Sequence, residues 1–257
     1  MPFALITGAS KGIGKAIAEL LAARGYDLLL VARSADLLQQ VSTNIETTTK
    51  RSCQWLALDL ASDQAAETVF DWCEKNQIDI SVLVNNAGYG LSGSFEKYSV
   101  QEHADMLHVN MITLTKLTRL FLPGLLKQPK AFILNIGSTA SYQAVPLLSA
   151  YAASKAYVLS FSRGLYHELK KTNVSVTCVC PGPTDTNFIN RANIGAKGIK
   201  AAERVNMSPQ SVARIAVDSL FRRKPEVITG TMNKLVTFFV WLLPKTIIEG
   251  VAKKLYD

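Results

Sequence analysis

The sequence predicts an α/β protein with a doubly wound parallel sheet of about seven strands, flanked by helices and folded as one domain over residues 1–257. Short runs rich in leucine and β-branched residues alternate with amphipathic helical stretches, which is the pattern of successive strand–helix–strand units. The runs are apolar at nearly every position, which indicates strands buried on both faces. No Pro-, Gly- or Ser-rich linker and no internal repeat divides the chain.

The predicted strands and helices follow one another in regular alternation. Strands are expected at Phe3–Thr7, Asp27–Ala32, Gln54–Asp59, Ser81–Asn85, Ala131–Gly137, Val174–Val179 and Glu226–Thr229. Helices are expected at Gly14–Arg24, Ala35–Thr48, Asp63–Asn76, Val100–Lys127, Ala150–Lys171 and Pro209–Arg223. Gly25 is a stop signal for the first helix, and Ser208-Pro209 supplies an N-cap and a first-turn proline for the last.

Two segments fit this alternation poorly. Residues 183–207 are rich in Asn, Gly and Lys, and we expect a long loop or a mobile pair of helices. Residues 230–257 contain the apolar run Leu235–Leu243, too short to span a bilayer, which takes about 20 residues, and a basic end at Lys253-Lys254. This tail has three interpretations. It packs on the core, it forms a substrate lid or subunit interface, or it contacts a membrane surface, and the last is the least favoured.

Charge and composition exclude several classes of protein. Lys plus Arg is 28 and Asp plus Glu is 20, so the net charge is +8, which favours anionic ligands. A nucleic-acid binder is not expected, because the cations are scattered and only Arg222-Arg223-Lys224 forms a cluster. The 4 cysteines and 3 histidines show no metal-site spacing, and we expect no metal and free, buried thiols. With no room for a signal peptide before Gly8, the chain is expected to be soluble and cytoplasmic.

A glycine-rich loop follows the first predicted strand. It reads Thr7-Gly-Ala-Ser-Lys-Gly-Ile-Gly14 and leads into a helix. Its glycines allow the backbone to approach a pyrophosphate, which the helix N-terminus attracts. A Walker loop is excluded, because Ala9 and Ala16 stand where that loop has Gly and Ser or Thr. A purely structural turn is the alternative. We expect a Rossmann-like dinucleotide site, with contacts from Gly8, Ser10, Lys11, Gly12, Ile13 and Gly14.

The end of the second strand predicts which dinucleotide binds. Many dinucleotide folds place Asp or Glu there to bind the ribose 2′-hydroxyl. Here the strand ends Leu30-Val31-Ala32-Arg33, without a carboxylate. The guanidinium of Arg33 suits a phosphate, and Lys11 adds a second cation. The sequence therefore predicts NADP(H) rather than NAD(H).

Tyr151-Ala-Ala-Ser-Lys155 begins a long predicted helix. Tyr and Lys at i and i+4 lie on one helical face, and an ammonium near a phenol lowers the phenol pKa. Such a phenol can exchange a proton with a carbonyl or alcohol oxygen. Tyr166 and Lys170 have the same spacing, but only Tyr151 follows a strand-end serine, Ser138, thirteen residues earlier. We therefore predict that Tyr151 is functional and that Tyr166 is a packing residue.

With these motifs in order, the chain resembles the short-chain dehydrogenase/reductase family over about residues 3 to 230. The marks are the glycine loop, Asp59, Asn85-Asn86-Ala87-Gly88, Asn110, Ser138, Tyr151-x-x-x-Lys155 and Pro181-Gly182. The resemblance implies hydride transfer between NADP(H) and a carbonyl or alcohol. It implies that Tyr151 is the acid/base, that Lys155 binds the nicotinamide ribose and tunes Tyr151, and that Ser138 binds the substrate oxygen.

The same resemblance implies the remaining contacts. Asn110 would shape its helix and hold a relay water. Cofactor contacts are expected at Arg33, Asp59, Asn86, Ala87, Gly88, Tyr151, Lys155, Pro181, Gly182, Thr184 and Thr186. The substrate is a small molecule bound by Gly90–Phe95, Thr139–Val145 and Phe188–Val205. We expect it to have an apolar body that lies under the 183–207 segment and is bordered by part of 230–257. A homodimer or homotetramer is also expected. A non-catalytic NADP(H)-binding module on the same scaffold is the main alternative function.

Overall fold

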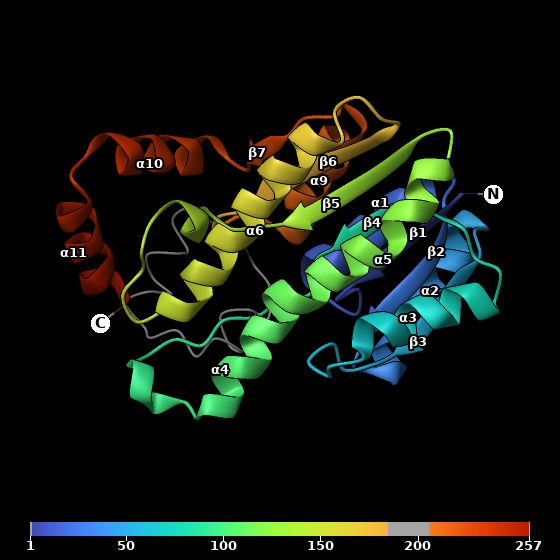
Figure 1. Ribbon diagram of the computed structural model, residues 1–257, viewed down its shortest axis with the longest axis horizontal. Coiled ribbons are helices and arrows are strands. Elements are labelled where there is room, and N and C mark those ends of the chain that lie inside the picture. Colours follow the sequence, from blue (N-terminus) through green and yellow to red (C-terminus); the bar gives the residue numbers. More distant parts are fainter. Residues whose placement is uncertain (1, 185–205, 257) are drawn as a thin grey trace.

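The computed structural model describes residues 2–184 and 206–256, and its centre is one parallel sheet of seven strands (Figure 1). The strands are β1 (Phe3–Thr7), β2 (Asp27–Ala32), β3 (Cys53–Ala57), β4 (Ile80–Asn85), β5 (Ala131–Ile136), β6 (Val174–Cys180) and β7 (Glu226–Ile228). Their order across the sheet is β3-β2-β1-β4-β5-β6-β7. The order reverses direction between β1 and β4, which is where open α/β sheets bind ligands. The predicted fold class is confirmed.

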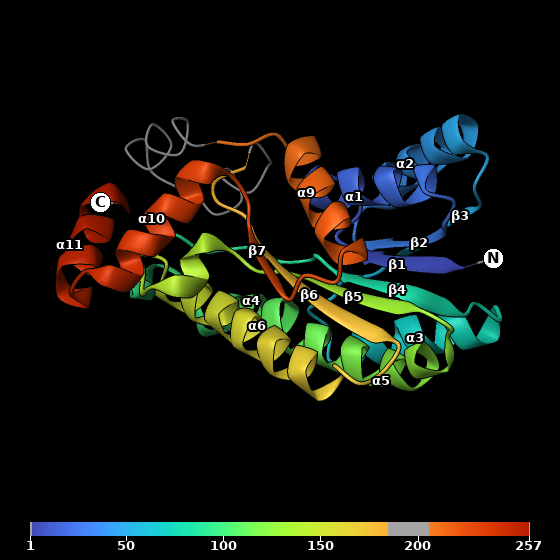
Figure 2. The same ribbon diagram turned by 90° about the horizontal axis from the view of Figure 1, so that it is seen from above.

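Two layers of helices cover the sheet. On one face lie α1 (Gly12–Ala23), α2 (Ala35–Thr49) and α9 (Pro209–Phe221), and on the other lie α3 (Ala65–Lys75), α5 (Leu114–Lys127) and α6 (Ser149–Glu168) (Figure 2). Every residue of β2, β4, β5 and β6 is buried, as the apolar runs predicted. Successive residues of β2 serve opposite layers: Leu28 and Leu30 pack in one core cluster, Leu29 and Val31 in the other.

The predicted helix Val100–Lys127 is interrupted. It consists of α4 (Val100–Leu107), a π-helical turn at His108–Thr113, and α5. Asn110 lies in this turn, where its Nδ2 donates to the carbonyl of Tyr89 at 3.0 Å and to Ser154 Oγ at 2.9 Å. Its Oδ1 accepts from the Tyr89 N–H at 3.1 Å. The widened turn therefore joins α4–α5 to the segment after β4 and to α6. Apolar periodicity did not predict it, because one π-turn hardly changes the pattern.

The tail forms two further helices beyond the carboxyl edge of the sheet. These are α10 (Thr231–Leu242) and α11 (Lys245–Tyr256) (Figure 1). Most of their large apolar side chains are exposed, from Phe239 at 45% to Trp241 at 79%, while Val240 and Ile248 are half-buried. The buried residues of α10 are Asn233 and Thr237 instead. The interpretation that the run Leu235–Leu243 completes the core is therefore wrong for this chain. In the described parts of the chain, no helix has the length and apolar character needed to cross a bilayer.

The four cysteines are buried and free, as expected. Cys178 and Cys180 lie on the same side of β6, with their sulfur atoms 3.9 Å apart. Burial raises the pKa of the Cys53 thiol to about 11 and that of Cys73 to about 12. These two thiols stay protonated near neutral pH and act as small apolar groups in the core.

Candidate active site

One cavity of about 830 Å³ lies at the carboxyl edge of the sheet, and most of the predicted site residues line it. Those lining it are Gly8, Ser10, Lys11, Gly12, Ile13, Arg33, Asp59, Asn86, Ala87, Gly88, Ser138, Tyr151, Lys155, Pro181, Gly182 and Thr184. Gly14 and Asn110 are buried and do not line it. Thr186 lies outside the described residues, as do residues 185–205 of the predicted substrate segment.

The glycine loop has the close packing that a dinucleotide cradle requires. Gly8 has φ +65°, in the left-handed region that favours glycine. A Cβ on Gly14 would lie 2.4 Å from the Gly8 carbonyl oxygen and 2.4 Å from Asn86 Nδ2. The Asn86 amide donates to the Thr7 carbonyl at 2.9 Å and to that of Gly8 at 3.2 Å. No larger residue fits at Gly14, and the open backbone suits a pyrophosphate.

Thr7 joins the two strands at which the sheet order reverses. Its Oγ1 donates to the Val84 carbonyl at 3.2 Å. The same oxygen accepts from the backbone N–H groups of Asn86 at 3.0 Å and Ala87 at 3.1 Å. Sequence reasoning assigned Thr7 only to a strand and its motif. These partners are more than seventy residues away in the chain, so no local pattern identifies them.

Two cations, Lys11 and Arg33, lie at the end of the cavity that the glycine loop borders. Lys11 and Arg33 both line the cavity and are exposed, and neither forms an ion pair with an acidic group among the described residues. Asp59, on the loop after β3, accepts from the backbone N–H of Ala61 at 3.1 Å. The carboxylate thus stabilises its own loop beside the cavity. Arg33 and Lys11 can therefore bind an anion in the cavity, and their contact with a 2′-phosphate stays a prediction.

Tyr151 and Lys155 lie together in the first turns of α6. Their side chains are 8% and 5% exposed, and the ammonium Nζ lies 5.9 Å from the centre of the Tyr151 ring. Lys155 Nζ also donates to the carbonyl of Ile136 at 2.8 Å, at the end of β5. Burial lowers the pKa of Lys155 to about 8. The ammonium therefore remains charged at neutral pH, in a position to favour the deprotonated form of the phenol.

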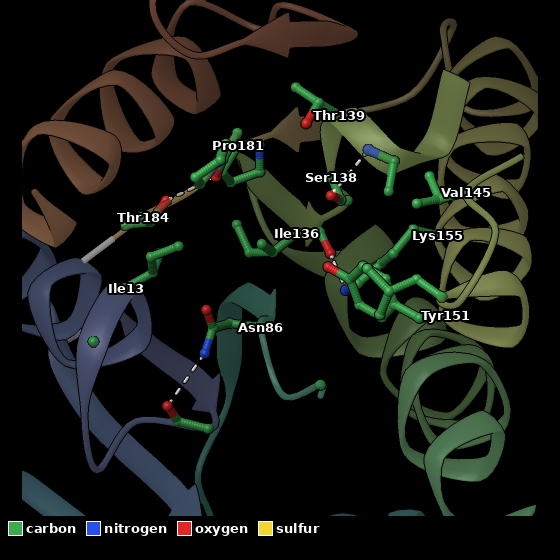
Figure 3. A pocket seen from close by; sticks show the side chains of 18 of the residues that line it. Ile13, Asn86, Ile136, Ser138, Thr139, Val145, Tyr151, Lys155, Pro181 and Thr184 are labelled. Atoms are coloured by element: carbon green, nitrogen blue, oxygen red, sulfur yellow. Dashed lines mark hydrogen bonds between the residues drawn. The ribbon is translucent and has the colours of Figure 1, made fainter. Parts of the chain in front are cut away.

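Ser138 follows β5 and faces the same space as Tyr151 and Lys155 (Figure 3). Its Oγ accepts from the backbone N–H of Ala140 at 3.1 Å, within the short helix Thr139–Tyr142. That bond occupies an oxygen lone pair and leaves the hydroxyl proton free to turn toward the cavity. Ser138 can therefore donate a hydrogen bond into the space that Tyr151 borders.

The far end of the cavity is apolar and includes residues that sequence reasoning did not single out. α10 and α11 contribute Val236, Phe239, Val240, Leu243, Ile247, Ile248, Val251 and Ala252. From the predicted segment Thr139–Val145, Gln143 lines the cavity and its buried Oε1 has no hydrogen-bond partner. The apolar run in the tail was the available signal, although it did not tell which side chains face inward.

Two predicted features lie elsewhere. The segment Gly90–Phe95, expected to bind substrate, contributes no residue to the cavity. It turns away because the Gly93 N–H donates to the Leu147 carbonyl at 2.9 Å and Phe95 stacks on His103 at 4.5 Å. Tyr166 packs against the core cluster beneath the sheet, as predicted for a structural residue.

The chain is similar in sequence to a known protein family and to individual proteins. The sequence profile of the short chain dehydrogenases matches residues 2–196. The chain is 36% identical over 185 residues to the very-long-chain 3-oxoacyl-CoA reductase of Mus musculus, covering 70% of this chain and 58% of that protein. It therefore spans less than two thirds of that relative's length.

Two solved structures share the fold over most of both chains. A short-chain dehydrogenase from Sphingobium yanoikuyae in complex with NADPH is 30% identical, with a TM-score of 0.82 over 90% of this chain and 89% of that one. The bulky-bulky ketone specific alcohol dehydrogenase from Comamonas testosteroni is 27% identical, with a TM-score of 0.77 over 94% and 93%.

Proposed function

The chain belongs to the short-chain dehydrogenase family, and on that premise we propose that it is an NADP(H)-dependent oxidoreductase that interconverts a carbonyl compound with an apolar body and the corresponding alcohol. One observation carries the proposal. A single cavity joins the glycine loop and Arg33 to Tyr151 and Lys155, and then to the apolar side chains of α10 and α11. Cofactor, proton donor and substrate body would thus occupy one continuous space.

The residues at the first end of the cavity fit the cofactor. Gly8 and Gly14 allow the backbone to approach the pyrophosphate, and the N-terminus of α1 attracts its charge. Lys11 and Arg33 are the two cations available for the 2′-phosphate. When bound, the nicotinamide supplies or accepts the hydride. Support for NADP(H) also comes from the NADPH complex of the Sphingobium relative.

The proton is handled by Tyr151. In the reduction direction its hydroxyl donates a proton to the substrate oxygen, and Ser138 donates a hydrogen bond to the same oxygen. The buried Lys155 ammonium stabilises the phenolate that remains. Asn110 acts behind these groups, because it ties the π-helical turn to the Tyr89 backbone and to Ser154 on α6. It thereby fixes the position of the helix that carries Tyr151.

The apolar end of the cavity favours a bulky or extended substrate. Burial of apolar area contributes roughly 25 cal/mol per Å², so a long hydrocarbon body gains several kcal/mol over a short one. The names of two relatives also refer to large substrates: one to very-long-chain acyl groups, the other to ketones with two bulky substituents. Gln143, whose Oε1 has no partner, offers an acceptor to a hydroxyl or N–H on that body.

The test is an assay of purified full-length protein with NADPH and a series of ketones of increasing apolar size. We follow the loss of the reduced-nicotinamide absorbance. The proposal predicts turnover, with kcat/KM rising along the series. Absence of turnover with every ketone and NADPH, and with the corresponding alcohols and NADP⁺, despite saturable NADPH binding, would favour the non-catalytic alternative.

A further inference from the structure

Helix α10 has apolar side chains on both its inner and its outer sides. Val236, Val240 and Leu243 line the cavity. Leu235, Phe238 and Leu242 do not line it, and each of the three is at least half exposed. These outer residues have the spacing i, i+3 and i+7, so they form one stripe on the helix. Trp241, the most exposed apolar side chain of α10, lies beside that stripe. We call Leu235, Phe238, Trp241 and Leu242 the outer apolar face.

An apolar stripe on a helix is normally buried against a partner. On the inner side, Asn233 and Thr237 are buried and Val236 borders the cavity. No described residue buries the outer apolar face. Figures 1 and 2 both show α10 and α11 at one end of the molecule, beyond the sheet and its two helical layers. The length of α10, about 18 Å at 1.5 Å per residue, is less than the roughly 30 Å of a bilayer core. A helix of this length can lie in a membrane interface but cannot cross it.

The charges around this face are mostly positive. Residues 231–256 contain Lys234, Lys245, Lys253 and Lys254, with Glu249 as the only acidic residue. None of the four lysines forms an ion pair with a described residue. Long lysine side chains can reach headgroup phosphates while apolar neighbours insert below them, and tryptophan favours the same interface. Apolar area and unpaired cations therefore occur on the same two helices.

We propose that α10 and α11 dock on the surface of an anionic lipid bilayer, with the outer apolar face inserted at the headgroup boundary and the four lysines among the phosphates. A second copy of this chain fits this surface less well. A two-fold interface places the patch of one copy against the same patch of the other, which brings two lysine-rich surfaces together. The membrane contact that the sequence favoured least for the tail is thus the one proposed for its outer side, while its inner side lines the cavity. Homodimer or homotetramer contacts through other surfaces remain compatible with this docking.

The docking does not depend on the reaction, so it can fail independently of the proposed function. Its test is flotation of the full-length protein with vesicles of phosphatidylcholine alone, and with vesicles containing about 30% phosphatidylglycerol. The bound fraction should rise at least about fivefold on the anionic vesicles and fall on adding salt. Leu235→Glu/Leu242→Glu should lower the partition coefficient about tenfold. Val100→Glu/Leu126→Glu, which places the same charges on exposed apolar sites outside the tail, should bind like the wild type.

A second readout guards against misfolding of the variants. Tryptophan emission of the wild type should shift to the blue on anionic vesicles, and Trp241→Phe should remove that shift while NADPH binding is retained. Lys234→Gln/Lys245→Gln/Lys253→Gln/Lys254→Gln should lose the preference for anionic vesicles. Equal binding by the wild type and Leu235→Glu/Leu242→Glu would overturn the proposal. Failure of the wild type to bind either kind of vesicle would also overturn it. This includes the case in which the wild type is a dimer and Leu235→Glu/Leu242→Glu is a monomer.

Discussion

The side-chain amide of Asn233 on α10 lies directly against Gly182, in the turn that follows β6. A Cβ built on Gly182 would lie 2.3 Å from Asn233 Nδ2 and 2.4 Å from Oδ1. Asn233 is buried, and its Nδ2 donates to the Thr229 carbonyl at 2.8 Å. The tail thus packs closely on this cavity-lining turn, because the Asn233 amide contacts a backbone that has no side chain at Gly182.

Gly182→Ala should therefore destabilise the protein, by about 1 to 3 kcal/mol, because the added methyl overlaps a hydrogen-bonded, buried amide. Urea denaturation measures the change. In the background Asn233→Ala, which removes the obstructing atoms, the cost of Gly182→Ala should fall. Gly124→Ala is the matched control, since its Cβ would meet no atom within 4 Å. If the changes in the free energy of unfolding caused by Gly182→Ala and Asn233→Ala are additive, this contact does not hold α10 in place.

Arg33→Gln should weaken NADPH binding about tenfold, equivalent to about 1.4 kcal/mol, and leave NADH binding unchanged. The reason is that Arg33 lines the cavity with no acidic partner among the described residues, so under the proposed function its guanidinium would bind the 2′-phosphate. In the wild type, NADPH should bind at least about tenfold more tightly than NADH. Titration calorimetry gives all four dissociation constants, and Arg222→Gln on the exposed end of α9 is the control. Equal affinity of the wild type for both cofactors would contradict the assignment.

Lys155→Met should alter how stability depends on pH. The folded-state pKa of about 8 lies below the ordinary value of 10.5, because burial disfavours the ammonium. Between these values the unfolded chain binds more protons, so the wild type gains stability as pH rises through that window. The free energy of unfolding of Lys155→Met minus that of the wild type should thus be about 2 kcal/mol higher at pH 7 than at pH 10.

Denaturation at both pH values measures this difference, with the exposed Lys170→Met as control. The same variant should lose turnover, and wild-type reduction should decline above pH 8 as Lys155 loses its proton. If the difference in stability between the wild type and Lys155→Met does not vary with pH, burial does not lower the pKa of Lys155.

Leu243→Ala and Leu242→Ala should separate the inner and outer sides of the tail. Leu243 lines the cavity, whereas its neighbour Leu242 does not. Truncation of Leu243 should lower kcat/KM for a long-chain ketone about fivefold and leave a short ketone unaffected, because only the long body reaches it. Leu242→Ala should change neither. Equal losses in both variants, or for both substrates, would indicate a general disturbance instead of a substrate contact.

The parts of the site that the sequence predicts well are those encoded within a few residues. The glycine loop, Arg33 after its strand and the Tyr151–Lys155 pair each follow from local spacing, and all line the cavity. The sheet was predictable because its strands are buried on both faces and so have few polar positions. β1 and β2 have the predicted bounds.

The features that sequence reasoning missed depend on contacts between distant segments. Asn233 reaches Gly182 only after α10 has folded back over the end of the sheet. Thr7 meets Asn86 only because β1 and β4 are neighbours. Gly90–Phe95 was wrongly expected to bind substrate, since the hydrogen bond from Gly93 to Leu147 that turns it away leaves no mark in the local composition.

The central claim is that Tyr151 is the proton donor of an NADPH-dependent carbonyl reduction, and a pair of phenylalanine substitutions tests it most directly. The measurement is kcat for an apolar ketone together with the dissociation constant of NADPH, in Tyr151→Phe and in Tyr166→Phe. Tyr151→Phe should lower kcat at least about a hundredfold, with NADPH affinity within about threefold of wild type, because only the hydroxyl is removed from the site. Tyr166→Phe, with the same spacing to a lysine but packed beneath the sheet, should retain near-normal activity. An active Tyr151→Phe enzyme, or a loss of turnover in Tyr166→Phe alone, would contradict the account.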